Sequence, residues 1–197
     1  MFSHGTKRRP DAGNAAYVAL CITLVGSLMG CSDPPTADGT SGQAGQSPTV
    51  AGELDGNSLP PWPAPADVPD RVADAGLDLG PMGMAEHYHP QLQIIVNGVE
   101  VPVPANIGVD AATGAMSALH THTADGELHV EADVAGETFT LGQLFTEWGV
   151  KLGPEQIGGA KAKAGEAVTV TSNGSPYAGD PAELRLEPDQ HIVVSLG

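Results

Sequence analysis

The chain has 197 residues, with 24 acidic and only 8 basic side chains, which gives a formal net charge of −16 at pH 7. A charge of this sign argues against nucleic acid and anionic lipid surfaces as partners, and it favours cations near the protein. The two cysteines, Cys21 and Cys31, lie near the N-terminus, so the rest of the chain offers neither a disulfide nor a thiolate metal site.

Residues 1–30 have the organisation of an export signal rather than of a folded element. A basic segment at residues 7–9 precedes an apolar stretch, residues 15–28, that is too short to span a membrane comfortably. The stretch ends in Leu28-Met29-Gly30-Cys31, which resembles the lipobox of bacterial lipoproteins. This resemblance implies cleavage before Cys31, acylation of its thiol, and an extracytoplasmic protein that is lipid-anchored to a bacterial membrane. An ordinary signal peptide or an uncleaved anchor is the alternative.

Residues 31–66 have the composition of a tether. They are rich in Gly, Ser, Thr, Pro, Asp and Ala and contain few large apolar side chains. Such a segment cannot bury enough surface to offset the entropy of ordering, so we predict that it is disordered and holds a domain away from the membrane. Residues 67–197 leave room for one folded domain.

The first elements predicted in this domain are a short helix at residues 68–79 and a hairpin. Residues 89–96 lead into Asn97-Gly98, a pair that favours a type I′ turn, and the chain returns through residues 99–104. The two prolines of the return strand cannot donate ladder hydrogen bonds, so we expect this strand at the edge of a sheet.

The strongest helix signal lies at residues 139–149. Thr140 can cap the helix, and Gln143 completes a capping box. Gly149 suits a left-handed helix end. One apolar stripe with helical spacing is formed by Leu141, Leu144, Phe145 and Trp148.

Further strands are predicted at residues 167–172, 183–186 and 191–196. The sequence therefore predicts an α+β fold, with β-hairpins in a mainly antiparallel sheet and one short helix packed across it. A β-grasp-like arrangement is one form that such a fold can take.

The second hairpin predicts a cluster of polar side chains. Asp125-Gly126 between two alternating runs is a strong signal for a two-residue turn, which would place His122 opposite His129 and His120 opposite Glu131. Side chains two apart in a strand share a face, and directly opposed pairs have Cβ atoms about 4.5–5.5 Å apart. These three histidines and the carboxylate are therefore expected on one face. The other face, which can pack on a core, carries Leu119, Thr121, Leu128, Val130 and Ala132.

Two further histidines, His87 and His89, fall on a polar face if the pleat of the first hairpin extends back to residue 87. They converge with the other histidines if the two hairpins join one sheet, and otherwise they form a polar strand entry. Imidazole and carboxylate groups suit Zn²⁺, Cu²⁺ and similar ions. Met82, Met84 and Met116 border this region. Thioethers select Cu(I), which favours copper somewhat over zinc, although methionine is also a common filler of cores.

Three segments together resemble a family of exported bacterial and archaeal proteins. They are His87-x-His89, then Leu119-His120-Thr121-His122 continued by Asp125-Gly126, His129 and Glu131, and then Thr140-Leu141-Gly142-x-x-Phe145-x-x-Trp148-Gly149. The resemblance covers about residues 76–197. It implies a single folded unit and supplies no mechanism, because that family has no assigned activity.

These features predict an extracytoplasmic lipoprotein that binds a transition metal, copper somewhat before zinc, for buffering, delivery or sensing. The predicted metal ligands are His120, His122, His129 and Glu131, with His87 and His89 as a second pair or as extra ligands. Two alternatives stay open. One is a metalloenzyme in which three histidines hold an ion that activates water, and an enzyme is the less favoured class. The other is a metal-free adhesion or assembly module with a pH-sensitive histidine surface.

Overall fold

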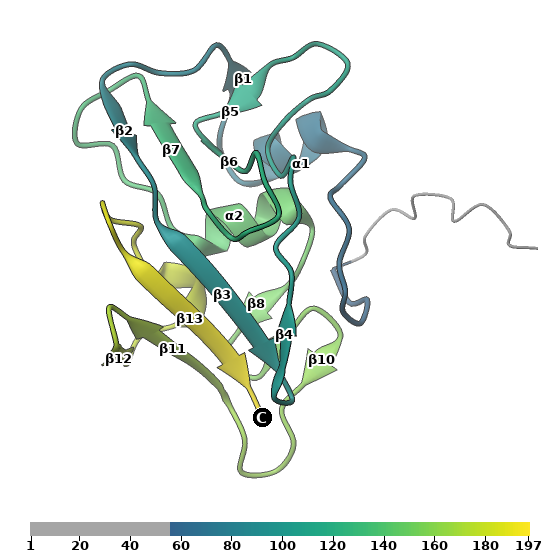
Figure 1. Ribbon diagram of the computed structural model, residues 1–197. Coiled ribbons are helices and arrows are strands. Elements are labelled where there is room, and N and C mark those ends of the chain that lie inside the picture. Colours follow the sequence, from purple (N-terminus) through teal and green to yellow (C-terminus); the bar gives the residue numbers. More distant parts are fainter. Residues whose placement is uncertain (1–55) are drawn as a thin grey trace, which may run out of the picture. The chain divides into compact units, whose positions relative to one another are not determined.

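The computed structural model describes residues 56–197 (Figure 1). The predicted signal segment, Cys31 and most of the predicted tether lie outside the described residues. Within residues 56–197, no helix is both long enough and apolar enough to cross a membrane.

A five-stranded mixed sheet forms the centre of the fold. Its strands are β3 (Gln91–Val96), β4 (Val99–Val101), β11 (Val168–Ser172), β12 (Ser175–Tyr177) and β13 (His191–Leu196). The spatial order is β12-β11-β13-β3-β4. Strand β4 lies at an edge, as Pro102 and Pro104 shortly after it predict. The two hairpins are antiparallel, and β13 lies between them, parallel to β3 and antiparallel to β11. With a helix between the hairpins in the chain, this is the β-grasp topology, so the predicted α+β class is confirmed.

Helix α2 (Leu141–Trp148) begins and ends where the sequence predicts. The Thr140 hydroxyl accepts a hydrogen bond from the Gln143 N–H, and the Gln143 side chain accepts one from the Thr140 N–H. Gly149 ends the helix in the left-handed conformation, with φ of 75°. All four residues of the apolar stripe are buried, in one core with the inner faces of β3 and β13. A helix this short depends on such packing, because isolated helices of its length are marginal in water.

Residues 56–66 contribute to the same core. Trp62 is only 2% exposed, and its ring meets that of Trp148 edge-on at 5.7 Å. The Trp62 indole N–H donates to the Ser58 carbonyl at 2.8 Å, and the Trp148 indole N–H donates to the Pro63 carbonyl at 2.9 Å. The packed domain therefore begins before residue 67, the start that composition predicts, because one large aromatic residue anchors the Pro-rich segment.

Short elements complete the domain. They are α1 (Val68–Asp74), β1 (Leu79–Gly80), β5 (Met116–Ser117), β8 (Leu152–Gly153), β9 (Gln156–Ile157), β10 (Ala160–Lys161) and the 3₁₀ turn η1 (Pro181–Glu183). Helix α1 is shorter than the predicted 68–79. The strand predicted at 183–186 is wrong, since η1 occupies its start and only Arg185 makes an isolated bridge to Thr140. Asp180 caps this turn by accepting a hydrogen bond from the Ala182 N–H, which favours a turn over a strand.

A three-stranded sheet carries the candidate site. Its strands are β2 (Glu86–Tyr88), β6 (Leu119–His120) and β7 (His129–Ala132), in the order β2-β7-β6. Figure 1 shows the chain passing from β2 directly into β3 of the central sheet. The strand predicted at residues 89–96 therefore begins only at Gln91, and its pleat does not extend back to residue 87. Pro90 has no N–H to donate to a ladder, and it separates β2 from β3 so that each joins a different sheet.

Candidate metal centre

Strands β6 and β7 pair two residues out of the predicted register. His120 lies opposite His129 rather than opposite Glu131. The predicted two-residue turn at Asp125-Gly126 is wrong. A type I′ turn needs positive φ at both central positions, and only Gly126, with φ of 83°, has it. The longer connection is held instead by the Leu92 N–H, which donates to the Gly126 carbonyl at 2.8 Å. A slip of two residues preserves the side-chain alternation, so every side chain keeps its predicted face.

The predicted apolar face packs on the core as expected. All five of its residues are completely buried: Leu119, Thr121, Leu128, Val130 and Ala132. Thr121 is also hydrogen-bonded, since its hydroxyl donates to the Pro104 carbonyl at 2.8 Å and accepts from the Ile107 N–H at 3.1 Å. Packing on this face fixes the strands that carry the polar cluster on the other.

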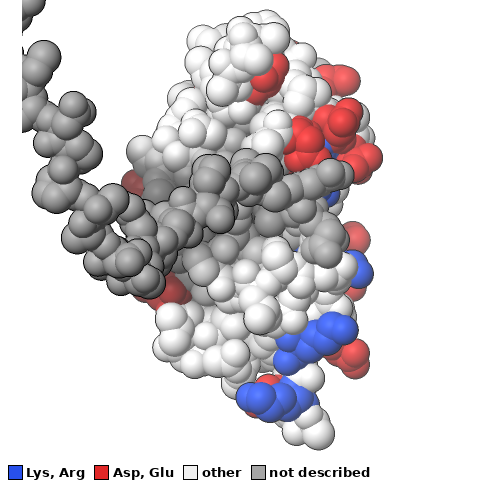
Figure 2. Space-filling model, turned by 90° about the vertical axis from the view of Figure 1, so that its right-hand side faces the viewer, with Lys and Arg blue, Asp and Glu red and all other residues white. Residues whose placement is uncertain are grey.

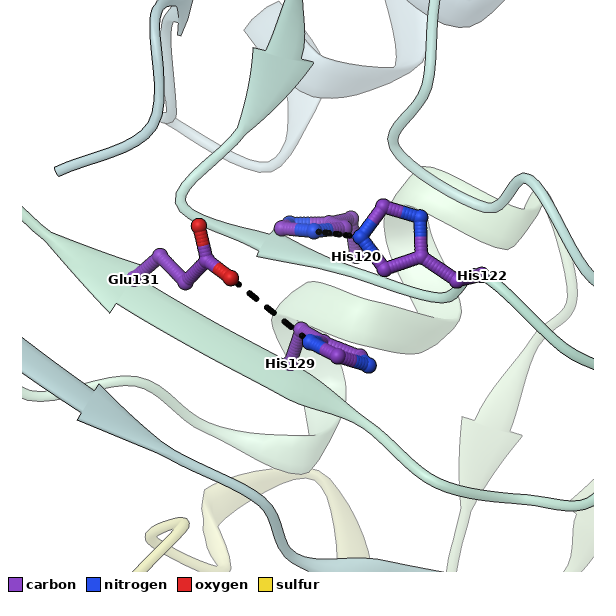
Figure 3. A group of neighbouring side chains, drawn as sticks. All are labelled: His120, His122, His129 and Glu131. Atoms are coloured by element: carbon purple, nitrogen blue, oxygen red, sulfur yellow. Dashed lines mark hydrogen bonds and ion pairs between the residues drawn. The ribbon is translucent and has the colours of Figure 1, made fainter.

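The four predicted ligands of the second hairpin come together (Figure 3). One donor atom from each of His120, His122, His129 and Glu131 lies within 4.8 Å of the others, which is a group that can hold a metal ion. The Nε2 atoms of His120 and His122 are 3.1 Å apart. Neighbouring donors around a tetrahedral ion with bonds of 2.0–2.1 Å lie about 3.3 Å apart, so this pair is already close to ligand spacing.

His120 is the most enclosed member of the group, with no exposed surface. Its Nδ1 lies 2.8 Å from the Ser117 carbonyl oxygen. A carbonyl can only accept, so Nδ1 carries the proton and the Nε2 lone pair faces His122. Burial lowers the pKa of His120 to about 4, partly opposed by the bond to Ser117, so the ring is neutral at neutral pH. A metal-binding imidazole has this arrangement, in which the second nitrogen is tied to an acceptor.

His129 occupies the middle of the cluster. Its Nε2 lies 3.2 Å from a carboxylate oxygen of Glu127, and its Nδ1 lies 3.6 Å from a carboxylate oxygen of Glu131. The Nδ1 atom is buried and has no hydrogen-bond partner. Burial lowers the pKa of His129, and the nearby His122 and His89 lower it further. Glu127 can therefore fix the Nε2 proton and leave Nδ1 as a ligand atom.

His87 and His89 join the cluster from β2, on the other side of β7 from β6. Strand β2 pairs with β7 so that His87 lies opposite Glu131, with Nε2 3.3 Å from its carboxylate oxygen. The Nε2 atoms of His87 and His89 are 2.9 Å apart. Both rings are exposed, and with His129 they form a second group that can hold an ion. Of the two alternatives for His87 and His89, the structure shows convergence: the five histidines lie in two groups that share His129, whereas His191 is exposed and belongs to neither group.

The bordering methionines are mostly at the surface. Met82 is 46% exposed and Met84 is 92% exposed, so the core-filling alternative is wrong for these two. The segment between them follows β7, because the Gly83 N–H donates to the Glu131 carbonyl at 3.2 Å. A side chain at Gly83 would collide with the Ala132 backbone, which explains the glycine between the methionines.

Three residues around the cluster were not predicted from the sequence: Ser117, Glu127 and Glu147. Glu127 lies two residues before His129, so the alternation of side chains along a strand would have placed it on the same face as His129. Glu147 lies in α2, one turn after Leu144 at the flank of the apolar stripe, and is completely buried. Gly108 lies between Glu147 and His120: a Cβ placed on it would be 3.2 Å from a Glu147 carboxylate oxygen and 3.2 Å from the His120 Cβ. The Glu147 carboxyl is therefore close to the backbone end of the His120 side chain. Burial raises the pKa of Glu147 to about 8, and the Ser117 hydroxyl opposes that rise.

The positively charged side chains are unevenly distributed over one face of the domain (Figure 2). In Figure 2, most of the Lys and Arg atoms on the face in view lie in the lower half of the domain. The sheet with β2 and β7 lies in the upper half of Figure 1, and the two views share their vertical axis. One basic residue does lie close to the cluster, since Arg185 lines the same surface pocket as His87.

The fold and the site define a class: a β-grasp α+β domain in which a small second sheet carries a histidine- and carboxylate-rich group that can bind a metal ion. Comparison of the chain with models of known families, with characterised proteins and with solved structures found no match. The function must therefore be argued from the site itself.

Proposed function

We propose that this protein is an exported lipoprotein that binds one or more transition-metal ions outside the cytoplasm, copper somewhat in preference to zinc. The primary ligands are His120, His122, His129 and Glu131. The role is buffering, delivery or sensing of the metal.

The proposal rests on several nitrogen and oxygen lone pairs that lie close together and have few hydrogen-bond donors to satisfy them. The His120 Nε2 presents a lone pair to the His122 Nε2 at 3.1 Å, since its proton lies on Nδ1. The His129 Nδ1 is buried and unpartnered, and an ionised carboxylate such as Glu131 can only accept hydrogen bonds. Buried polar atoms without partners cost free energy, and a cation is the one partner that satisfies all of these atoms together.

The preference for copper rests on the methionines. Imidazole and carboxylate ligands suit zinc as well as copper, so the four primary ligands do not discriminate. Met82 and Met84 lie at the surface on the segment that is hydrogen-bonded to the backbone of Glu131. Thioethers are soft ligands that favour Cu(I), and their exposure beside the site favours copper.

Export and anchoring are supported by the sequence alone. The basic segment, the apolar stretch and the lipobox-like Leu28-Met29-Gly30-Cys31 stand in the order that a bacterial lipoprotein signal requires. An extracytoplasmic location also agrees with the absence of cysteine after Cys31.

Calorimetric titration of the purified full chain with Cu²⁺ and with Zn²⁺ tests the metal-binding proposal. We expect His122→Ala and His129→Ala each to weaken Cu²⁺ binding strongly. The double variant should lose little more than either single variant, because both rings serve the same ion. His191→Ala is the matched control, since it removes an exposed histidine outside the cluster. Unchanged Cu²⁺ and Zn²⁺ affinities in the His122 and His129 variants would overturn the assignment of the site.

A further inference from the structure

The histidine cluster consists of two groups that share one ring. Donor atoms within 4.8 Å of one another form one group with His120, His122, His129 and Glu131, and another with His87, His89 and His129. In the sheet order β2-β7-β6, one pair comes from each side of β7. The His129 ring centroid lies 4.5 Å from that of His122 and 4.5 Å from that of His89. The shared ring thus lies between two histidine pairs rather than at the centre of one shell.

A single four-coordinate ion does not use all of these donors. It takes one atom each from the four primary ligands, which leaves the rings of His87 and His89. The two remaining Nε2 atoms are 2.9 Å apart, and that of His87 lies 3.3 Å from a Glu131 oxygen. These separations are again close to the roughly 3.3 Å between neighbouring ligands of a tetrahedral ion.

We propose that the centre holds two transition-metal ions, with the second bound by His87 and His89 and the carboxylate of Glu131 bridging both. This inference rests on the proposed function and adds a second site to it. A carboxylate can bridge two ions, through one oxygen each or through a single shared oxygen, and ions in two-metal sites lie about 3.5–4 Å apart. Glu131 suits the bridging role because its carboxylate lies between a ring of each group: the same oxygen, Oε1, is 3.3 Å from His87 Nε2 and 3.6 Å from His129 Nδ1.

The two ions differ in their exposure to solvent. The first has the fully buried His120 among its ligands, whereas both histidines of the second are exposed. Three protein ligands leave the second ion with an open position for water, as in sites that exchange ligands. The second ion should therefore exchange faster with a chelator than the first.

The test is the metal content of the purified full chain, loaded with excess Cu²⁺ alone and measured by elemental analysis after removal of unbound metal. We expect two copper ions per chain in the wild type and in the His191→Ala control. The double variant His87→Ala/His89→Ala should retain one. Its fold is checked by circular dichroism, and exposed side chains such as these can be truncated without opening a core cavity. Two copper ions that share a carboxylate are also magnetically coupled, so the paramagnetic signal per copper should be higher in the double variant than in the wild type.

The outcomes separate this inference from the proposed function. One copper ion per chain in both the wild type and the double variant overturns the second site and leaves the first intact. Two ions in both proteins place the second ion elsewhere and also overturn the inference. No bound copper in any of the proteins overturns the second site together with the proposed function.

Discussion

The buried carboxyl of Glu147 makes the stability of this domain depend on pH in a way that one substitution should remove. Its pKa is about 8 in the folded protein, compared with an ordinary value of 4.5. Between these pH values the folded state binds one proton more than the unfolded state, so the free energy of unfolding falls as pH rises. The fall is about 1.4 kcal/mol per pH unit, since that is the free energy of one pKa unit.

From pH 6.5 to pH 8, two histidines of the cluster act in the opposite direction to Glu147. His120 has a folded pKa of about 4 against an ordinary 6.5, so between these values it binds fewer protons when folded, and its contribution to stability rises with pH. The lowered pKa of His129 acts in the same direction. At pH 6.5 an ordinary imidazole is still half protonated, so from pH 6.5 to pH 8 each of these rings adds up to about 0.4 kcal/mol of stability, whereas the contribution of Glu147 falls by about 1.6 kcal/mol. From pH 6.5 to pH 8 the wild type should therefore lose about 1 kcal/mol of unfolding free energy.

Denaturant unfolding of the metal-free full chain at pH 6.5 and pH 8 measures this loss. In Glu147→Gln, which keeps the shape of the side chain but cannot ionise, this loss should disappear, and the free energy of unfolding should rise by up to about 0.8 kcal/mol between these pH values. The matched control is Glu137→Gln, at an exposed glutamate, which should lose as much as the wild type. If Glu147→Gln and the wild type lost the same free energy over this window, the carboxyl would already be ionised in the folded protein, and the reasoning would be refuted.

Three other changes test the fold and the anchor. Trp62→Ala should destabilise the domain by about 3–5 kcal/mol in denaturant unfolding, as for other buried aromatic residues, and a loss below about 1 kcal/mol would place the segment outside the core. Gly126→Ala should weaken both stability and Cu²⁺ binding, because the added Cβ would collide with the Leu92 carbonyl. The control Gly114→Ala also has positive φ, 77°, but open space around it, so it should leave Cu²⁺ binding unchanged. Equal losses of Cu²⁺ binding in the two variants would contradict the role of Gly126. Cys31→Ala should move the protein from the membrane fraction to the soluble fraction, and retention in the membrane after normal cleavage would contradict acylation.

The sequence predicted which side chains share a face better than it predicted which residues pair. The alternation of β6 and β7 has a period of two, and the observed slip of two residues leaves it unchanged. The register itself was wrong because the connection containing Asp125 is held by contacts from another strand. Leu92 donates to Gly126, and the Gln91 side chain donates to the Asp125 carbonyl. Contacts between distant segments of this kind leave no local signal in the sequence.

Two buried residues, one in the core and one near the site, were missed for related reasons. Trp62 stands among prolines in a segment of tether-like composition, and only its partner Trp148 shows that it is a core residue. Glu147 follows the helical period at the flank of the apolar stripe, where a charged residue normally faces solvent. Its burial depends on how α2 is covered by Gly108 and its neighbours, which no local pattern encodes. The capping box and the left-handed end of α2, in contrast, are local interactions and were predicted correctly.

The geometry of the ligands links metal affinity to the stability of the domain. The bond from His120 to Ser117 and the contact of His129 with Glu127 orient two rings before an ion arrives, so binding need not supply the cost of ordering them. Without an ion, the folded state bears the cost of a buried unpartnered nitrogen in His129. An ion that binds only the folded state stabilises it by about 2.7 kcal/mol at a hundred times its Kd. A change that loosens the core behind β6 and β7 must therefore weaken metal binding even when every ligand is intact. Thr121→Val is such a change, because it removes the hydroxyl that satisfies both Pro104 and Ile107.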